Sequence, residues 1–216
     1  MKKKTAKKKN VPLGNASRFR AVFFDIGNVL LHFEAGCILR TFVKVLGKDP
    51  SKVMAFLKAK DLIDPIERGL LGPRKLYRKF CDSFGYQGSF ATFKRLWSDH
   101  FTLEPSTAAM LKAAAKRHKV FLLSNTNAIH YEFIVKNYAF PRHIHGAVLS
   151  HEVGLRKPEP AIYKEALRRA GVKASEAVFI DDLPENVEAA RKQGIHAILY
   201  PGPKELRRRL TELGVL

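Results

Sequence analysis

The sequence has 216 residues, 46% of them hydrophobic and 27% charged, which is typical of a globular protein with a buried core. It has no run of about 18 apolar residues that could cross a membrane. Its first lysines are not followed by the apolar stretch of a secretory signal, so we expect neither a membrane nor a secreted protein. Two cysteines cannot form a disulfide scaffold and fit a reducing, cytoplasmic location.

The charge is unusual, because 39 basic and 20 acidic residues give a net charge of +19. We predict a basic disordered tail over residues 1–18, since the segment MKKKTAKKKNVPLGNAS has no apolar periodicity. Residues 1–17 could make a weak contact with RNA or ribosomes, or they could be solvated without a specific partner. We favour the second interpretation, because runs of charge are common in proteins. The remaining positive charge attracts anions in general.

Apolar runs alternate with amphipathic segments along most of the chain. The runs predict buried strands, and they are Phe19–Leu31, Lys119–Ser124, Gly146–Ser150, Ala177–Asp181 and His196–Tyr200. The amphipathic segments predict helices, and they are Ser106–His118, Glu159–Ala170, Pro184–Gln193 and Pro203–Leu213. This alternation predicts an α/β fold with a doubly wound parallel sheet.

The segment between the first two predicted strands interrupts this alternation. From 34 to 103 we find no strand pattern, only amphipathic segments separated by Gly, Pro and polar residues. We therefore predict a helical cap at 34–103, inserted into an α/β core at 19–33 and 104–216. Ligands of open α/β sheets bind at the carboxyl ends of the strands, so such a cap would close over a site there.

Polar side chains follow four of the predicted strands at the point where each strand ends. They are Asp25, Ser124 with Asn125 (in LLSNTN), Lys157 (in GLRKPEP) and Asp181 with Asp182 (in VFIDDLPEN). The carboxyl ends of parallel strands meet at one edge of a sheet, so we expect these side chains to converge. Each residue taken alone is as easily a turn residue or a helix cap, but their common position at strand ends favours a site.

The chemistry of these residue types indicates phosphoryl transfer. Carboxylates from two strands suit Mg²⁺, and a lysine beside them offsets their repulsion and neutralises a phosphate. Ser124 and backbone N–H groups could hold the phosphate oxygens. One aspartate could then attack phosphorus as a nucleophile.

The segments FDIGNVL, LLSNTN, GLRKPEPAIY and FIDDLPENVEAA resemble the motifs of the haloacid dehalogenase (HAD) superfamily, over about residues 19–216. The residues of these segments are most similar to those of subfamily IA, which has a helical C1 cap, and to its bacterial α-D-glucose-1-phosphate phosphatase branch. The resemblance implies a HAD-like Rossmannoid core. It also implies a Mg²⁺-dependent phosphatase that hydrolyses a small phosphorylated metabolite, such as a sugar phosphate.

The resemblance also implies a role for each motif residue. Asp25 would be the nucleophile that forms an aspartyl-phosphate, and Lys157 would pair with Asp25 and the phosphate. Ser124 and the Asn125 backbone would bind the phosphoryl group. The metal would be held by Asp25, the backbone carbonyl of Gly27 and Asp182, with Asp181 and Asn186 in supporting positions.

Position 27 departs from the usual pattern of the superfamily. Most of its phosphatases have an aspartate there, two residues after the nucleophile, as the general acid and base, whereas this chain has Gly27. The glucose-1-phosphatase branch resembles this chain in having glycine. The general acid therefore stays open between a metal-bound water, Asp181, Glu67 and His32.

The glycine also leaves two other functions open. One is a metal-independent dehalogenase, because dehalogenases of this superfamily also have no aspartate two residues after the nucleophile. Against this interpretation, those enzymes do not have the acidic pair that this chain has at Asp181 and Asp182. A catalytically weak member could instead act by binding RNA or ribosomes through its basic tail.

Overall fold

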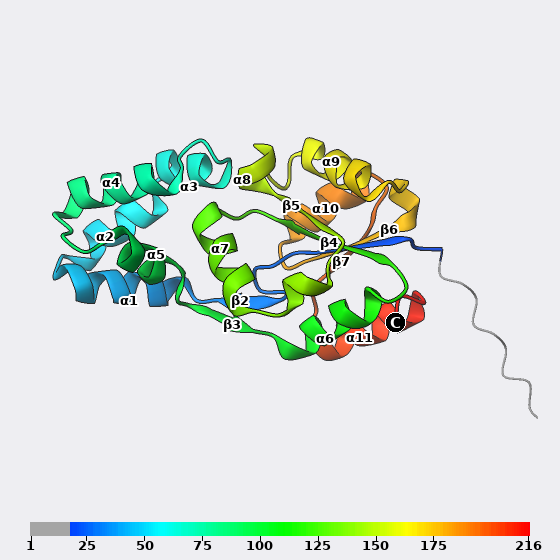
Figure 1. The fold of residues 1–216 in the computed structure, drawn as a ribbon. Helices are drawn as coiled ribbons and strands as arrows, with labels where there is room; N and C mark the ends of the chain where they lie inside the picture. The colour runs from blue at the N-terminus through cyan, green and yellow to red at the C-terminus, as the bar shows by residue number, and fades with distance from the viewer. Residues whose placement is uncertain (1–17) are drawn as a thin grey trace, which may run out of the picture.

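A computed structural model describes residues 18–216, so the predicted tail contact at 1–17 lies outside the described residues. Five parallel strands form the main sheet in the order β5-β4-β1-β6-β7 (Figure 1). They are β1 (Ala21–Phe24), β4 (Lys119–Ser124), β5 (Gly146–Leu149), β6 (Ala177–Asp181) and β7 (His196–Leu199). The predicted α/β class with a doubly wound parallel sheet is confirmed.

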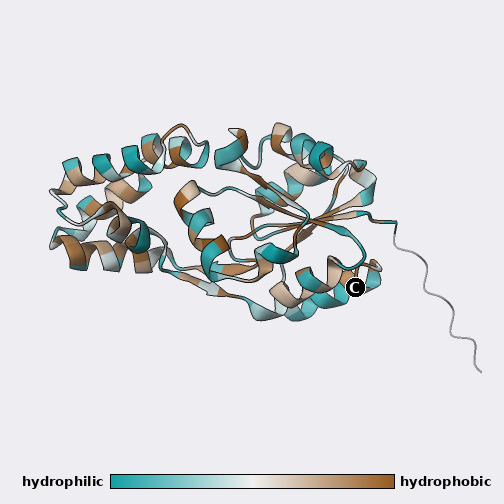
Figure 2. Ribbon diagram, viewed as in Figure 1, coloured by the Kyte–Doolittle hydropathy of each residue, from teal (hydrophilic) through white to brown (hydrophobic). Residues whose placement is uncertain are grey.

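The central strand β1 fixes the register of the sheet. Phe24 of β1 pairs with Leu122 of β4 on one side and with Ile180 of β6 on the other. All residues of β1 and β6 are buried, which explains their uninterrupted apolar sequence. Hydrophobic colour accordingly follows the strands through the middle of the molecule (Figure 2).

Helices cover both faces of the sheet (Figure 1). On one face α6 (Pro105–Ala114) and α11 (Pro203–Glu212) pack around Phe24, and on the other α9 (Pro160–Ala170) and α10 (Pro184–Lys192) pack around Phe23. Consecutive strand residues point to opposite faces, so β1 serves both cores. All four helices start with proline, whose fixed φ suits the first helical position.

The first predicted strand, Phe19–Leu31, is too long. β1 ends at Phe24, and the chain then turns through Asn28, which has a left-handed φ of 52°. The N–H groups of Leu30 and Leu31 donate to the carbonyl of Ile26. The apolar sequence continues past the strand because Ile26, Val29 and Leu30 of this turn are buried in the core, and periodicity cannot distinguish such a turn from a strand.

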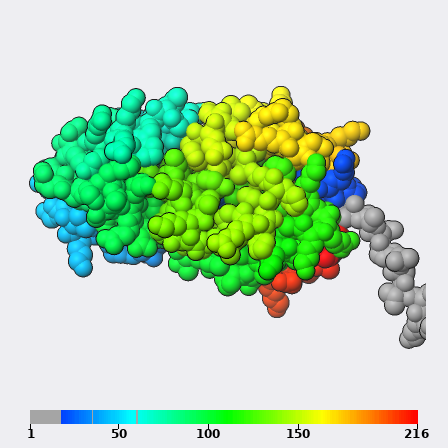
Figure 3. Space-filling model, viewed as in Figure 1, coloured from blue at the N-terminus to red at the C-terminus, as the bar shows by residue number. Residues whose placement is uncertain are grey.

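Five helices lie between the short strands β2 (Leu31–Phe33) and β3 (Phe101–Leu103), which pair antiparallel. They are α1 (Ala35–Leu46), α2 (Pro50–Lys58), α3 (Lys60–Glu67), α4 (Pro73–Phe84) and α5 (Phe90–Ser98). We call α1–α5 the helical insertion; it occupies one end of the molecule (Figure 3). β3 corrects our expectation of no strand at 34–103, and its three residues are too few to show alternation.

The helical insertion has its own core, in which Phe42, Phe80, Phe93 and Trp97 are in ring contact. Helix α7 (Ala128–Asn137) reaches both cores, because Ile129 joins this cluster and Ile134 joins the cluster under the sheet. We did not predict α7. The remaining short elements are η1 (Phe140–His143), α8 (Ser150–Val153) and η2 (Ala174–Glu176). Within residues 18–216, no helix is long and apolar enough to cross a membrane.

Candidate active site

Asp25 and Lys157 are in direct contact at the carboxyl ends of the parallel strands, which we call the sheet edge. The N–H of Asp25 donates to the carbonyl of Ile180 at 2.9 Å, which extends the β1–β6 ladder by one residue. Lys157 Nζ lies 2.9 Å from Asp25 Oδ1 and 2.6 Å from Asp181 Oδ2. The lysine side chain is 1% exposed and the two carboxylates are 9% and 0% exposed. A buried cation therefore bridges two buried anions.

Burial dominates the electrostatics of this group. The pKa of Asp25 is raised to about 6, because desolvation and the charge of Asp181 together outweigh the opposing charge of Lys157. Burial disfavours the charged form of Lys157 too, but Asp25 and Asp181 outweigh it, so the lysine pKa is raised and the amine stays protonated. Two carboxylates share one ammonium, which leaves excess negative charge for a cation to neutralise.

Hydrogen bonds hold Asp181 in one orientation. Besides the bond to Lys157, its Oδ1 accepts from the Leu183 N–H and from Asn186 Nδ2, both at 2.9 Å. The Asn186 carbonyl in turn accepts from the Tyr163 hydroxyl at 2.9 Å. The amide of Asn186, for which the resemblance implies a supporting position, is thus used to orient Asp181.

Asp182 is half-buried and is held by Asn28, a residue that our sequence analysis missed. Asn28 Nδ2 donates to Asp182 Oδ2 at 2.9 Å, and Asn28 Oδ1 accepts from the Phe33 N–H at 3.4 Å. Asn28 therefore connects β2 to the acidic pair. A sequence signal was present, since an asparagine among apolar residues after a strand is typical of a left-handed turn position.

The three aspartates can hold a metal. One carboxylate oxygen from each of Asp25, Asp181 and Asp182 lies within 4.8 Å of the other two. Gly27, whose carbonyl we expected as a further ligand, lies in the turn that follows Asp25. Hard carboxylate oxygens in a partly dry site suit Mg²⁺, so the donor set fits the metal that the sequence predicts.

Ser124 and Asn125 end β4 beside this cluster. The Ser124 side chain is one of the groups that oppose the effect of burial on the pKa of Asp25. Asn125 uses its side chain to hold the lysine backbone, because Nδ2 donates to the Lys157 carbonyl at 2.9 Å and Oδ1 accepts from the Lys157 N–H at 2.8 Å. The positioning of Lys157 by this side chain is a contact that sequence spacing could not reveal.

The side-chain candidates for the general acid have different surroundings. Asp181 already accepts three hydrogen bonds. The side chain of His32 is 54% exposed, and its Nε2 lies 3.4 Å from Glu104. Glu67, at the end of α3, is largely buried and pairs with Arg156, the neighbour of Lys157, at 2.6 Å. Burial raises the pKa of Glu67 despite the nearby Arg156 charge.

Ion pairs tie the helical insertion to the loop that carries Lys157. Arg156 Nη1 lies 2.7 Å from Asp64 of α3, and Arg68, which follows α3, pairs with Asp64 and with Glu159 on the other side of Lys157. These groups are partly exposed, so water screens the pairs and each contributes little to stability.

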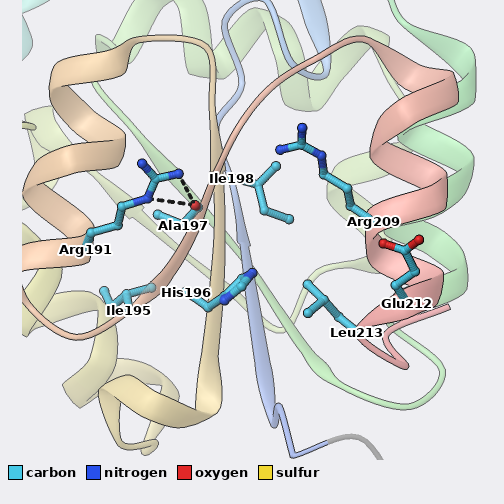
Figure 4. Close-up of a pocket in the computed structure, with 8 residues that line it drawn as sticks. All are labelled: Arg191, Ile195, His196, Ala197, Ile198, Arg209, Glu212 and Leu213. Atoms are coloured by element: carbon cyan, nitrogen blue, oxygen red, sulfur yellow. Dashed lines mark hydrogen bonds between the residues drawn. The ribbon is translucent and has the colours of Figure 1, made fainter.

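A different cleft, of about 430 Å³, lies beside the edge strand β7 (Figure 4). Arg191 crosses its rim and donates to the Ala197 carbonyl at 3.0 and 3.2 Å, while Arg209 and Glu212 line the α11 side. None of the predicted site residues lines it. This cleft is therefore separate from the carboxyl ends of the strands, which carry the predicted site residues.

The parallel sheet, the helical insertion and the buried cluster of three carboxylates and a lysine define an α/β enzyme of the hydrolase class. The chain belongs to the haloacid dehalogenase-like hydrolases, whose family model matches residues 19–194. The resemblance seen in the sequence is thus confirmed at the level of the superfamily.

Two similar proteins are phosphatases. The chain is 22% identical over 197 residues to D-ribitol-5-phosphate phosphatase from Bacteroides thetaiotaomicron, covering 88% of this chain and 96% of the relative. It is 26% identical over 190 residues to a sesquiterpene phosphatase from Aspergillus oryzae, covering 82% and 87%. These relatives give no support to the predicted nucleic-acid contact.

A solved HAD family enzyme from Bacteroides thetaiotaomicron, in complex with magnesium and inorganic phosphate, superposes with a TM-score of 0.74. It is 26% identical, and the match covers 83% of this chain and 93% of that one. The similarity extends over both the sheet and the insertion. Membership of the glucose-1-phosphate branch stays a prediction.

Proposed function

We propose that this protein is a Mg²⁺-dependent phosphatase that hydrolyses a small phosphate monoester through an aspartyl-phosphate on Asp25. The observation that carries the proposal is the buried Lys157 ammonium between Asp25 and Asp181, with Asp182 beside them. The phosphatase relatives and the similar magnesium and phosphate complex support it.

In the first step a carboxylate oxygen of Asp25 forms a bond to phosphorus while the bond from phosphorus to the leaving alcohol oxygen breaks and that oxygen takes a proton. Lys157 holds Asp25 in place and, with Ser124 and the Asn125 N–H, stabilises the negative oxygens of the phosphoryl group. In the second step water attacks phosphorus, the bond to Asp25 breaks and the carboxylate is restored. A Mg²⁺ ion on Asp25, Asp182 and the Gly27 carbonyl would supply positive charge to the phosphoryl oxygens.

The helical insertion, which lies within the cap predicted at 34–103, would act as that cap. Its α3 contacts the Lys157 loop through Asp64, Glu67 and Arg68. We propose that these contacts close the site over bound substrate and exclude bulk water. The alternative of a metal-independent dehalogenase has less support, because Asp182 and the pair it forms with Asp181 would have no role there.

The test is phosphate release from a panel of phosphorylated metabolites that includes α-glucose 1-phosphate, measured with Mg²⁺ and with EDTA. Asp25→Asn keeps the size of the side chain, and we expect it to lower turnover by at least about 10³-fold. Asp61→Asn, on an exposed residue of α3, is the matched control and should leave turnover unchanged. Turnover by Asp25→Asn at the level of the control would exclude the mechanism.

A further inference from the structure

The three aspartates of the site differ in how firmly hydrogen bonds hold them. Lys157 contacts both Asp25 and Asp181, and Asp181 accepts two further hydrogen bonds. The Asp182 side chain is more exposed than the other two, and it makes one hydrogen bond with the described residues, in which Asn28 Nδ2 donates at 2.9 Å. The orientation of Asp182 therefore depends on Asn28 more than on any other side chain.

The backbone conformation at Asn28 is unusual for a residue that has a side chain. Nine described residues have a left-handed φ; eight of them are glycines, and the other is Asn28, at 52°. Glycine adopts this conformation without a steric cost, whereas asparagine adopts it only at some cost. The turn by itself is therefore best served by glycine, which indicates that the Asn28 side chain has a role of its own.

Both ends of the Asn28 amide are used. Its Oδ1 accepts from the Phe33 N–H at 3.4 Å, which leaves the Nδ2 donor facing the Asp182 carboxylate. A carboxylate that accepts from a fixed donor does not rotate freely, so both of its oxygens keep their places. One of the Asp182 oxygens lies within 4.8 Å of a carboxylate oxygen of Asp25 and of Asp181. The hydrogen bond thus keeps the third carboxylate beside the other two.

Electrostatic repulsion opposes this arrangement. Three carboxylates so close together repel one another, and the Lys157 ammonium contacts only Asp25 and Asp181. Within residues 18–216, no cationic side chain forms an ion pair with Asp182. Asn28 is a neutral donor, so it stabilises the Asp182 carboxylate in this position without neutralising it. The negative charge of Asp182 therefore stays available to a cation.

We propose that Asn28 is a positioning residue for the metal, and that its amide holds the Asp182 carboxylate ready to bind Mg²⁺ together with Asp25. This inference rests on the proposed phosphatase function and deepens it at the metal site. A ligand that is held in place before the ion binds loses less freedom on binding, which raises the affinity for the ion. The loss of such a supporting contact typically lowers metal affinity by about 10- to 100-fold.

The test variant is Asn28→Gly, which removes the amide and keeps the left-handed turn. Titration of the full-length protein with magnesium chloride alone, followed by isothermal titration calorimetry, measures the Kd for Mg²⁺. We expect the Kd of Asn28→Gly to be roughly 10- to 100-fold higher than that of the wild type. Asn137→Gly is the matched control, because Asn137 Nδ2 also donates a hydrogen bond, at 2.8 Å to the Phe133 carbonyl, but lies at the end of α7. Its Kd should equal that of the wild type.

Turnover at different Mg²⁺ concentrations distinguishes positioning from a loss of structure. Bound Mg²⁺ can itself hold Asp182, so saturating Mg²⁺ should return the kcat of Asn28→Gly for p-nitrophenyl phosphate to the wild-type level. The Mg²⁺ concentration that gives half of this kcat should rise by the same factor as the Kd. Asp25→Asn should stay inactive at every Mg²⁺ concentration. The unfolding midpoint of each variant in EDTA shows whether it is folded.

The outcomes separate the two proposals. If the wild-type protein does not bind Mg²⁺, the metal of the proposed function and this inference both fail. If the wild type binds Mg²⁺ and releases phosphate but Asn28→Gly has the wild-type Kd, the inference is wrong and the phosphatase proposal stands. An equal rise of the Kd in Asn137→Gly, or a kcat that saturating Mg²⁺ does not restore, would likewise overturn the inference. A raised Kd in Asn28→Gly alone, with no phosphate released from any compound by the wild type, would support Asn28 as a positioning residue and overturn the phosphatase proposal.

Discussion

The sheet edge and the helical insertion position their side chains by different means. At the sheet edge, strand register and hydrogen bonds fix each charged group, as Asp25 and Asp181 show. In the helical insertion, a cluster of aromatic rings forms the core, and charges face the rest of the molecule at the end of α3 and at Lys94 of α5. The comparison indicates that the reactive groups depend on polar networks, whereas the surface that covers them depends on apolar packing.

Replacing Lys157 should produce the largest effect, because it removes the one cation between two buried carboxylates. We expect Lys157→Met to abolish phosphate release. In EDTA at pH 7.5 it should lower the free energy of unfolding by about 3 to 5 kcal/mol. Without the lysine, the folded-state pKa of Asp25 rises still further above its unfolded value. Protonation on going to pH 5 then relieves the repulsion and restores part of the stability.

Urea unfolding of Lys157→Met at both pH values measures this effect. Lys164→Met, on an exposed lysine of α9, is the control. A stability loss that is the same at pH 5 and pH 7.5 would contradict the assigned role of the lysine charge.

Phe80→Ala should lower the stability of the helical insertion by about as much as Lys157→Met lowers the free energy of unfolding, and it should leave the polar network of the site intact. Phe80 is fully buried and contacts the rings of Phe42 and Phe93. We expect a loss of about 3 to 5 kcal/mol, seen by hydrogen exchange as faster exchange of α1–α5 amides than of β1, β4 and β6 amides. Phe179→Ala, in β6, is the matched change and should affect the sheet. Equal acceleration of all amides in both variants would mean that the two regions unfold as one unit.

The smallest expected effect is a pH dependence at the junction of the two regions. His130 of α7 is half-buried against the insertion, and its Nε2 lies 3.1 Å from the Trp97 carbonyl. Burial, with the nearby His100, lowers the pKa of His130 to about 3. The unfolded chain takes up a proton below about pH 6.5 and the folded chain does not, so stability falls as the pH drops, by roughly 1.4 kcal/mol per pH unit below that value.

Urea unfolding at pH 7 and pH 5 for the wild type and His130→Gln checks this prediction. The variant should lose less stability than the wild type over this interval, because glutamine does not titrate. Identical pH dependence in the two proteins would show that His130 does not contribute.

The difference between the sheet and the helical insertion also explains which elements can be predicted from the sequence. β4 and β6 were predicted at their observed bounds, because an uninterrupted apolar run ending in a polar residue is a strong strand signal. Helix α7 was missed, because it packs against two cores and so has no single apolar face.

In the site, the convergence of Asp25, Lys157 and Asp181 followed from strand ends alone. The hydrogen bonds from Asn28 to Asp182 and between Asn125 and the Lys157 backbone could not be predicted in this way. Their geometry depends on where two loops distant in sequence meet, and no local pattern reports that.

Helix α7 packs against both the helical insertion and the sheet core, and this has a mechanical consequence for the molecule. On its α7 side the insertion is attached by the buried Ile129 and by the hydrogen bond from Ser98 to the Ile129 carbonyl, in addition to the Lys94–Glu132 ion pair. On its α3 side several ion pairs join it to the Lys157 loop. Water and dissolved salt can replace ion pairs but cannot replace buried apolar contacts. The two sides of the insertion therefore separate from the core at unequal cost, which gives any opening a preferred direction, away from the Lys157 loop and pivoting on α7.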